Sequence, residues 1–319
     1  MNAVLGDPEI ALLTEIASLY YLEGETQESI AKKLHISRIK VGRLLKKAHG
    51  EGIVDVRVRH HPSVSAELES KLVRKFGIQR ALIAPNYANA ERQRHAVAGL
   101  VADYLTRRLE DNTVVAVGMG RNVGAVADNV FTQVTRTAAF VSAIGGSLKA
   151  GEYMNPDHIC RRLAAKFGGE SETLYAPALI QDPAVRQALQ ENPTVKQTLD
   201  RARRADLALV GVGDMSEDSN MVRMGWFSPQ EIAEARLAGT VGDIMGYDFI
   251  NIKGIETQPV MRGRVIGLDI HDLRRIPDVI AIASENTKVS GILGALRTGV
   301  IDTLATSTNN ALTVLELAG

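Results

Sequence analysis

The first fifty residues carry apolar positions at helical spacing, and these positions divide into three short predicted helices. In the first helix, the residues that recur every three or four places are Ile10, Leu13, Ala17 and Tyr20. Gly24 ends that helix, and the hydroxyl of Thr26 is a candidate N-cap for a second helix over residues 27–34. Ser37 is a candidate N-cap for a third. Three short helices in series are typical of a helix-turn-helix.

The third helix is predicted to bury an apolar side and expose a cationic one. Its inward positions are Val41, Leu44, Leu45 and Ala48. The basic residues between Gln27 and His49 are Lys32, Lys33, Arg38, Lys40, Arg43, Lys46 and Lys47, against the single acid Glu28. This local excess of positive charge would attract DNA phosphates, although the whole chain has a formal net charge of zero. The alternative is an ordinary solvated helix face.

A short turn at His35 and Ile36 would hold the third helix where it can enter the major groove of double-stranded DNA. Many such motifs have glycine where His35 stands, but histidine adopts positive φ comparatively often. The candidate DNA-binding residues are Thr26, Gln27, Ser37, Arg38, Lys40, Arg43, Lys46 and Lys47.

Beyond the third helix, apolar and charged residues alternate from Ile53 to Arg59, which predicts a β-ribbon or wing. We therefore expect a winged helix-turn-helix DNA-binding domain over residues 1–59. A polar break at residues 60–63 marks the expected linker to a second region.

From residue 64 onward, predicted helices and strands alternate. Helices are predicted over residues 64–76 and 91–109. Strands are predicted over residues 81–84, 113–117, 139–143, 207–212, 248–252, 265–268, 279–283 and 303–306. This alternation predicts an α/β fold, a larger Rossmann-like domain over residues 64–319 with a mostly parallel sheet and helices on both faces. Ligands of such sheets bind beyond the carboxyl ends of the strands.

The strand predicted over residues 113–117 is followed by a glycine-rich loop with Gly118, Gly120, Arg121 and Asn122. Such a loop lets backbone amides approach an anion at the start of the next helix, and Arg121 could add a charge-assisted bond. The third glycine comes one place later than in the dinucleotide fingerprint, and no acidic residue ends the next strand. NAD binding is therefore a minority interpretation. Tight turns without any ligand remain an alternative.

Composition narrows the function classes further. The chain has 319 residues and is 45% hydrophobic, which suits two globular domains. It lacks both a secretory leader pattern and a run of about 18 apolar residues, so we expect a cytoplasmic protein with no membrane partner. Cys160 is the single cysteine, and the histidines have no metal-ligand spacing. No metal and no cofactor are expected.

Several motifs in order resemble those of one protein family. They are TQESIAKKLHISRIKVGRLLKKAHGEGIV, AVGMGRN, AGTVGDIMGYDF and ENTKVSGILGALRTGVIDTLAT. Together they look like the SorC family of sugar-binding transcriptional regulators. The resemblance spans nearly the whole chain. It implies an effector domain similar to sugar-phosphate isomerases of the glucosamine-6-phosphate deaminase type, without their catalysis, and assembly into homodimers or homotetramers that sense sugars, polyols or their phosphates.

The resemblance also implies effector-binding residues. The family's phosphate loop matches Gly118, Gly120, Arg121 and Asn122, and the loop after the next strand matches Gly145, Gly146 and Ser147. An acidic contact matches Asp243, and a lysine matches Lys288. A carboxylate can accept from sugar hydroxyls, and an ammonium can reach a hydroxyl or phosphate. The alternative is that both are ordinary surface or paired charges.

Three places depart from the family's pattern. Members often carry threonine near Asn122, two glycines where Ser284 and Glu285 stand, and aspartate in place of Ser307. Losing a hydroxyl and glycine amides would weaken a phosphate site, and an inward Glu285 would repel a phosphate. These departures slightly favour an unphosphorylated polyol or sugar, with a sugar phosphate close behind.

The sequence therefore predicts a DNA-binding transcriptional regulator of a carbohydrate or polyol catabolic operon, controlled by a small effector. One alternative is an enzyme of sugar-phosphate metabolism with an appended helix-turn-helix, in which the glycine loops, Asp243 and Lys288 would form the active site. Another is a structural DNA-binding protein with no ligand.

Overall fold

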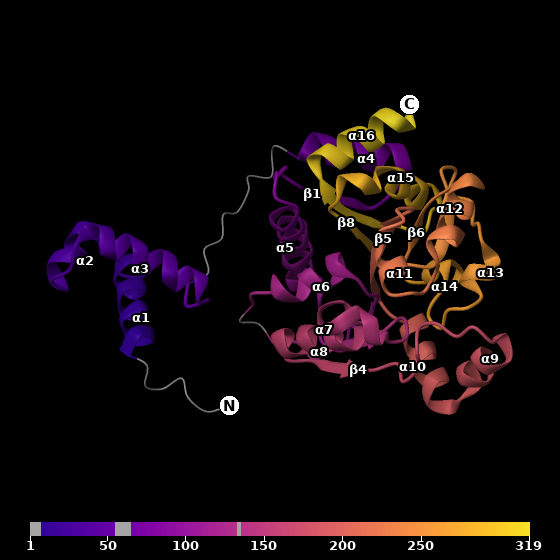
Figure 1. Cartoon of the computed structure of the whole chain (residues 1–319), viewed down its shortest axis with the longest axis horizontal. Helices are drawn as coiled ribbons and strands as arrows, with labels where there is room; N and C mark the ends of the chain where they lie inside the picture. The colour runs from indigo at the N-terminus through magenta and orange to yellow at the C-terminus, as the bar shows by residue number, and fades with distance from the viewer. Residues whose placement is uncertain (1–7, 55–64, 133–134) are drawn as a thin grey trace. The chain divides into compact units, whose positions relative to one another are not determined.

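The structure, a computed structural model, describes residues 8–54, 65–132 and 135–319. The chain divides into two compact units, one that ends at His61 and one that begins at Pro62. Within the described part of the first unit the helices are α1 (Pro8–Tyr21), α2 (Gln27–Lys33) and α3 (Arg38–Gly50), all labelled in Figure 1. The prediction of three helices in series is confirmed.

Side-chain caps and a small core organise the first unit. The Ser29 N–H donates to Thr26 Oγ1 and the Lys40 N–H to Ser37 Oγ, both at 3.2 Å, so both predicted N-caps are confirmed. The core residues are Leu13, Ile16, Ala17, Leu19, Ile30, Ala31, Val41, Leu44, Leu45 and Ala48. His35 has a φ of 53°, as its place in the turn predicts. Most of the predicted wing, residues 55–59, lies outside the described residues.

The second unit is built on a parallel sheet. Its strands are β1 (Arg80–Ala84), β2 (Val114–Val117), β3 (Ala139–Ser142), β4 (Glu170–Glu172), β5 (Leu207–Asp214), β8 (Val279–Ala283) and β9 (Thr303–Ser307). Their order is β1-β9-β8-β5-β2-β3-β4, and all neighbouring pairs in it are parallel. β6 (Thr240–Ile244) and β7 (Asp248–Asn251) extend the end of β5 as an antiparallel ribbon. The predicted α/β class is confirmed.

Helices cover both faces of this sheet. The longer ones are α4 (Ala66–Phe76), α5 (Ala90–Arg108), α6 (Arg121–Asp128), α8 (Pro156–Phe167), α9 (Pro183–Glu191), α10 (Pro193–Arg203), α12 (Pro229–Leu237), α15 (Val289–Arg297) and α16 (Thr308–Ala318). The shorter ones are α7 (Gly151–Met154), α11 (Asn220–Arg223), α13 (Pro259–Arg262), α14 (Ile270–Leu273) and the 3-10 turns η2 (Leu148–Ala150) and η3 (Asn286–Lys288).

The residues of β5 show why the sheet has a core on each side. Leu207 and Leu209 pack in one apolar cluster with α5, α6 and α8. Ala208 and Val210 pack in the other, with α4, α10, α15 and α16. Successive side chains of a strand point to opposite faces, so a central strand buried on both sides is apolar throughout.

One predicted strand is wrong, and another is confirmed but belongs to an antiparallel ribbon. Residues 265–268 form no strand, because the Ile266 N–H donates to Ala178 O while Ile266 O accepts from the Gly145 N–H, which ties the segment to two different loops. Residues 248–251 do form β7, but it joins the antiparallel ribbon instead of the parallel sheet. Two strands were not predicted. They are β4, a short polar edge strand, and β6, whose apolar pattern is interrupted by glycine and aspartate.

The order of the strands creates a topological switch point between β2 and β5. From β2 the chain continues to β3 on one side, whereas from β5 it continues through the ribbon to β8 on the other. The segments that follow β2 and β5 therefore diverge, and a crevice opens beyond the carboxyl ends of these strands.

Candidate functional site

The outward face of α3 carries most of the predicted DNA-binding residues. Its exposed cations, for which no ion pair exists among the described residues, are Arg38, Lys40, Arg43 and Lys46. Lys47 differs, because its Nζ lies 2.6 Å from Glu9 Oε1 of α1. Gln27 is half-buried, and a Cβ at Gly42 of α3 would lie 3.3 Å from Gln27 Oε1. The predicted residues thus separate into an exposed row on α3 and residues engaged within the unit.

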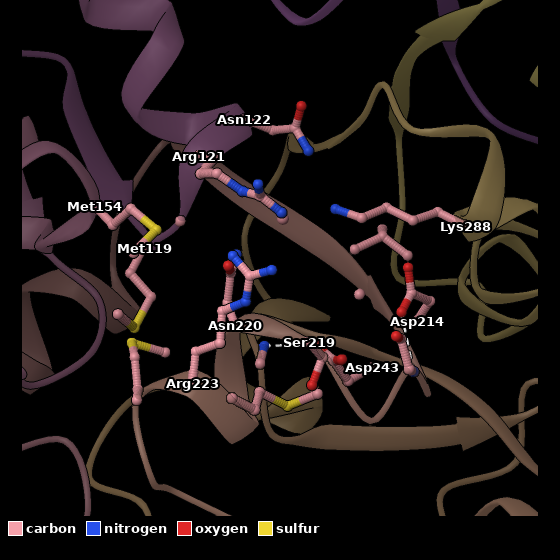
Figure 2. Close-up of a pocket in the computed structure, with 18 of the residues that line it drawn as sticks. Met119, Arg121, Asn122, Met154, Asp214, Ser219, Asn220, Arg223, Asp243 and Lys288 are labelled. Atoms are coloured by element: carbon pink, nitrogen blue, oxygen red, sulfur yellow. Dashed lines mark hydrogen bonds between the residues drawn. The ribbon is translucent and has the colours of Figure 1, made fainter. Parts of the chain in front are cut away.

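A cavity of about 360 Å³ lies at the switch point of the second unit. Its walls come from the loop after β2, the end of β5, the segment around α11, the ribbon of β6 and β7, and η3. Among the predicted effector-binding residues, it brings together Gly120, Arg121, Asn122, Asp243 and Lys288 (Figure 2). A cavity of this size suits a small ligand.

Three cations line the cavity, and they differ in their partners. Arg223 is held by Asp218, whose carboxylate oxygens accept from its Nε and Nη2 at 2.8 and 2.5 Å. Lys288 Nζ lies 3.0 Å from Glu285 Oε2. Arg121 has no ion pair with any described carboxylate, and its Nε is buried without a hydrogen-bond partner. In Figure 2, the side chains of Arg121 and Lys288 point toward one another.

Two aspartates add acceptors to the cavity wall. Asp243 is buried, its Oδ1 accepts from the Gly246 N–H at 2.6 Å, and its Oδ2 has no hydrogen-bond partner among the described residues. Burial raises the pKa of Asp243 to about 7, against the Gly246 N–H and the positive charge of Lys288, which lower it. Asp214 Oδ2 accepts from Thr287 Oγ1 at 2.7 Å. Near neutral pH Asp243 can therefore accept from a hydroxyl or donate to one.

Three glycines fix the backbone around Asp243. A Cβ at Gly213 of β5 would overlap the Asp243 carboxylate. A Cβ at Gly242 of β6 would lie 2.6 Å from Gly213 O and 2.6 Å from Gly291 Cα of α15. Because glycine lacks a side chain, β5, β6 and α15 can approach this closely. The position of Asp243 therefore depends on steric fit.

Asn122 is held at both ends of its amide. Its Nδ2 donates to Glu285 Oε2 at 2.8 Å, and its Oδ1 accepts from Ser284 Oγ at 2.7 Å. Glu285 Oε1 also lies 3.6 Å from Arg94 Nη2. Burial raises the pKa of Glu285, but the charge of Lys288 and the hydrogen bonds from Asn122 and Lys288 outweigh it, so that the pKa falls to about 2. Three residues that depart from the family's pattern thus contact one another.

Four predicted effector-binding residues do not line this cavity. They are Gly118, Gly145, Gly146 and Ser147. The Gly118 N–H donates to Leu209 O at 2.8 Å, because this glycine lets the end of β2 lie against β5. The N–H groups of the other three also donate within the protein, at 2.8 to 3.0 Å. These donors are already engaged, so the loop after β3 differs from an open anion-binding turn.

Gly146 and Ser147 line a neighbouring cavity of about 830 Å³ instead. The two cavities share Met224 and Trp226 in their walls. Trp226 is buried, and its Nε1 donates to Ser147 Oγ at 3.4 Å. The second predicted loop therefore contacts the first cavity through this tryptophan.

Several cavity residues escaped the sequence analysis. Asp214 is the last residue of β5, and Asn220 and Arg223 come from the polar stretch after it, which has neither a period nor a recognised motif. The signal that could have found them is their place directly after the central strand, where ligands of such sheets bind.

We also considered metal binding, membrane insertion and a reactive cysteine in the part of the chain that the structure describes. No group of three or more His, Cys, Asp or Glu there could hold a metal ion. The helices described are also too short or too polar to cross a membrane. Cys160 is buried, and burial raises the pKa of its thiol to about 12, which suits a structural role.

Comparison with known proteins gives matches along most of the chain. The family described as "Putative sugar-binding domain" matches residues 60–316. The transcriptional regulator LsrR of Escherichia coli is 30% identical over 312 residues, which cover 95% of this chain and 94% of that protein. The match to a curated regulator thus includes both units.

Two solved structures support the same likeness. The full-length sorbitol operon regulator SorC from Klebsiella pneumoniae is 28% identical with a TM-score of 0.75, over 97% of this chain and 100% of that one. The sugar-binding domain of a transcriptional repressor from Vibrio fischeri is 55% identical with a TM-score of 0.75, over 80% of this chain and 99% of that one. These proteins are regulators of transcription.

Proposed function

The chain belongs to the SorC family of sugar-binding transcriptional regulators, and on this premise we propose that residues 1–59 bind operator DNA under the control of an effector bound by residues 64–319. It is a transcriptional regulator and not an enzyme, because its curated relatives include an erythritol catabolism regulatory protein, a sorbitol operon regulator and a deoxyribonucleoside regulator. The enzyme alternative has no support from them.

The exposed row on α3 is the proposed DNA-reading surface. Arg38, Lys40, Arg43 and Lys46 have no ion pair among the described residues, so their charges are available to phosphates and base edges. Ser37 and Thr26 support this surface by capping α3 and α2. Lys47 contributes less, since it is paired with Glu9.

The proposed effector is a small polyhydroxylated molecule: a sugar, a polyol or a sugar phosphate. The observation that carries this proposal is that two groups without partners among the described residues lie in the wall of one cavity. They are the guanidinium of Arg121, which has no ion pair, and Asp243 Oδ2, a buried oxygen that accepts no hydrogen bond. Each hydroxyl of a polyol both donates and accepts, so it can satisfy groups of either kind. Lys288 adds a second donor and Asp214 a second acceptor to the wall of the same cavity.

Effector binding is proposed to act on DNA through the quaternary arrangement. Two or more helix-turn-helix units, in a homodimer or homotetramer, would grip spaced half-sites in the cytoplasm. An effector that favours one arrangement would change the separation of these units. An effector that binds tightly and leaves operator affinity unaltered would contradict this coupling.

The test is a titration of the purified full chain against the DNA upstream of its own gene, with and without a panel of sugars, polyols and their phosphates. Tight binding that one compound alters supports the proposal and names the effector. Binding that no compound alters would favour a structural DNA-binding protein instead. A charge-neutral variant of the cavity, Arg121→Gln, should bind operator normally and lose the response.

A further inference from the structure

Glu285 holds the two cations that lie nearest to it. Its side chain is 17% exposed, that of Lys288 is 14% exposed and that of Arg94 is 13% exposed. The carboxylate stays ionised, as its lowered pKa requires. Lys288 therefore lines the cavity with its positive charge opposed by the Glu285 carboxylate at 3.0 Å, although the same carboxylate also faces Arg94.

The carboxylate of Glu285 is also held in place. Asn122 and Lys288 both bind its Oε2, and Asn122 is fixed in turn by the hydroxyl of Ser284. The backbone oxygen of Glu285 accepts from Asn310 Nδ2 at 3.3 Å. These contacts come from α6, η3 and α16, so Glu285 has little freedom to move away when a ligand enters.

The position of this carboxylate matters because Asn122 belongs to the first turn of α6. The start of a helix, with its unpaired N–H groups, is where a phosphate would otherwise be stabilised. Here the chain's own carboxylate contacts that turn through Asn122. An incoming phosphate would meet a fixed negative charge there and would find Arg121 as the one cavity-lining cation of the described residues without a carboxylate partner.

We propose that Glu285 is a built-in counter-ion that selects against phosphorylated effectors, so that the cavity takes an uncharged sugar or polyol. This inference rests on the proposed function, since it concerns the same cavity. It assigns Glu285 as a specificity-determining residue although Glu285 itself does not line the cavity.

The test replaces Glu285 by glutamine, which keeps the size of the side chain and removes its charge. The matched control is Glu256→Gln, because Glu256 is likewise paired with two basic residues, Arg262 and His271, and lies outside both cavities. Glu285→Ala serves as a second variant in case the glutamine disturbs the fold. The probes are inorganic phosphate and the pair sorbitol and sorbitol 6-phosphate, measured on the full chain by titration calorimetry.

We expect Glu285→Gln to bind inorganic phosphate and sorbitol 6-phosphate roughly tenfold more tightly than the wild type, with Glu256→Gln unchanged. The inference is overturned if neither Glu285 variant gains phosphate affinity, or if the wild type binds sorbitol 6-phosphate more tightly than sorbitol.

The experiments distinguish a failure of the inference about Glu285 from a failure of the proposed function. If the wild type releases its operator in response to a phosphorylated compound, the proposed function stands and this inference falls. If no compound affects the operator while Glu285→Gln gains phosphate affinity, the charge assignment stands and effector control falls.

Discussion

The exposed face of α3 and the cavity of the second unit both carry cations, but they hold them in opposite ways. On α3 the side chains of Arg38, Arg43 and Lys46 lie in solvent without carboxylate partners among the described residues. In the cavity, Lys288 is paired with Glu285, and the Nε of Arg121 is buried with no hydrogen-bond partner in the described part of the chain. Exposed charges act over about a Debye length on any polyanion. The partly buried charges of the cavity act on a group that fits against them, and this suits a small effector.

The outward face of α3 and the surroundings of Asp243 should differ in how well they tolerate amino-acid substitutions. An outward side chain of α3, such as Arg43 or Lys46, can be replaced without disturbing the core, because it is exposed. A residue around Asp243 cannot, because the backbones of β5, β6 and α15 meet there at glycines. Substitutions should therefore alter binding alone on α3, whereas in the cavity they should alter stability as well.

The largest effect is expected for Gly213→Ala. The added Cβ would overlap the Asp243 carboxylate, and overpacking of this kind should lower the free energy of unfolding of the second unit by about 3 kcal/mol. Trp226 is the single tryptophan and is buried in this unit, so its fluorescence during denaturation by urea reports the change.

Gly99→Ala is the matched control. A Cβ at Gly99, inside α5, would meet Asn129 Oδ1 at an ordinary 3.8 Å. Because alanine favours helix, the free energy of unfolding should stay the same or rise by up to about 1 kcal/mol. Equal losses for both variants would contradict the view that the cavity depends on steric fit.

A smaller effect is expected from the protonation of Asp243. Its folded pKa of about 7 lies above the ordinary value of 3.8, so the folded chain keeps a proton that the unfolded chain releases. The contribution of this group to stability is therefore full below pH 4 and falls as the pH rises toward 7. Between pH 5 and pH 8 the loss should be about 2 to 3 kcal/mol, because pH 5 lies two units below the folded pKa.

Asp243→Asn should remove this loss, so that the variant gains stability relative to the wild type as the pH rises. Urea denaturation at pH 5 and pH 8 measures the difference. Asp218→Asn is the control, because the exposed carboxylate of Asp218 has a pKa lowered by its hydrogen bonds and charge pairing with Arg223 and does not titrate in this range. A wild type and an Asp243→Asn variant with the same pH dependence would refute the burial argument.

The features that could be predicted from the sequence are those that depend on residues close together in the chain. The caps of α2 and α3, the inward face of α3 and the turn at His35 depend on residues close in the chain, and all were predicted. The central strands were also predicted, because their apolar runs follow from burial on both faces.

The features that could not be predicted depend on contacts between residues that are far apart in the chain. Gly145, Gly146 and Ser147 form a glycine-rich loop in the sequence, yet their N–H donors are engaged by Ile266, Ala176 and Asn155. The same long-range bonds tie down residues 265–268, which were predicted as a strand. The contact of Asn122 with Glu285 joins positions 163 residues apart, so no local pattern could reveal it.

The smallest of the expected effects concerns α3 itself and sharpens the comparison within one helix. Arg43→Ala removes an exposed cation without an ion pair in the described chain, and operator affinity should fall about tenfold, or about 1.4 kcal/mol, if Arg43 contacts a base edge. Lys47→Ala removes the same charge from a residue that contacts Glu9, so its loss should be smaller. Fluorescence anisotropy with labelled operator, at two salt concentrations, measures both. Equal losses for the two variants would show that only total charge matters, and that the outward row on α3 has no special role.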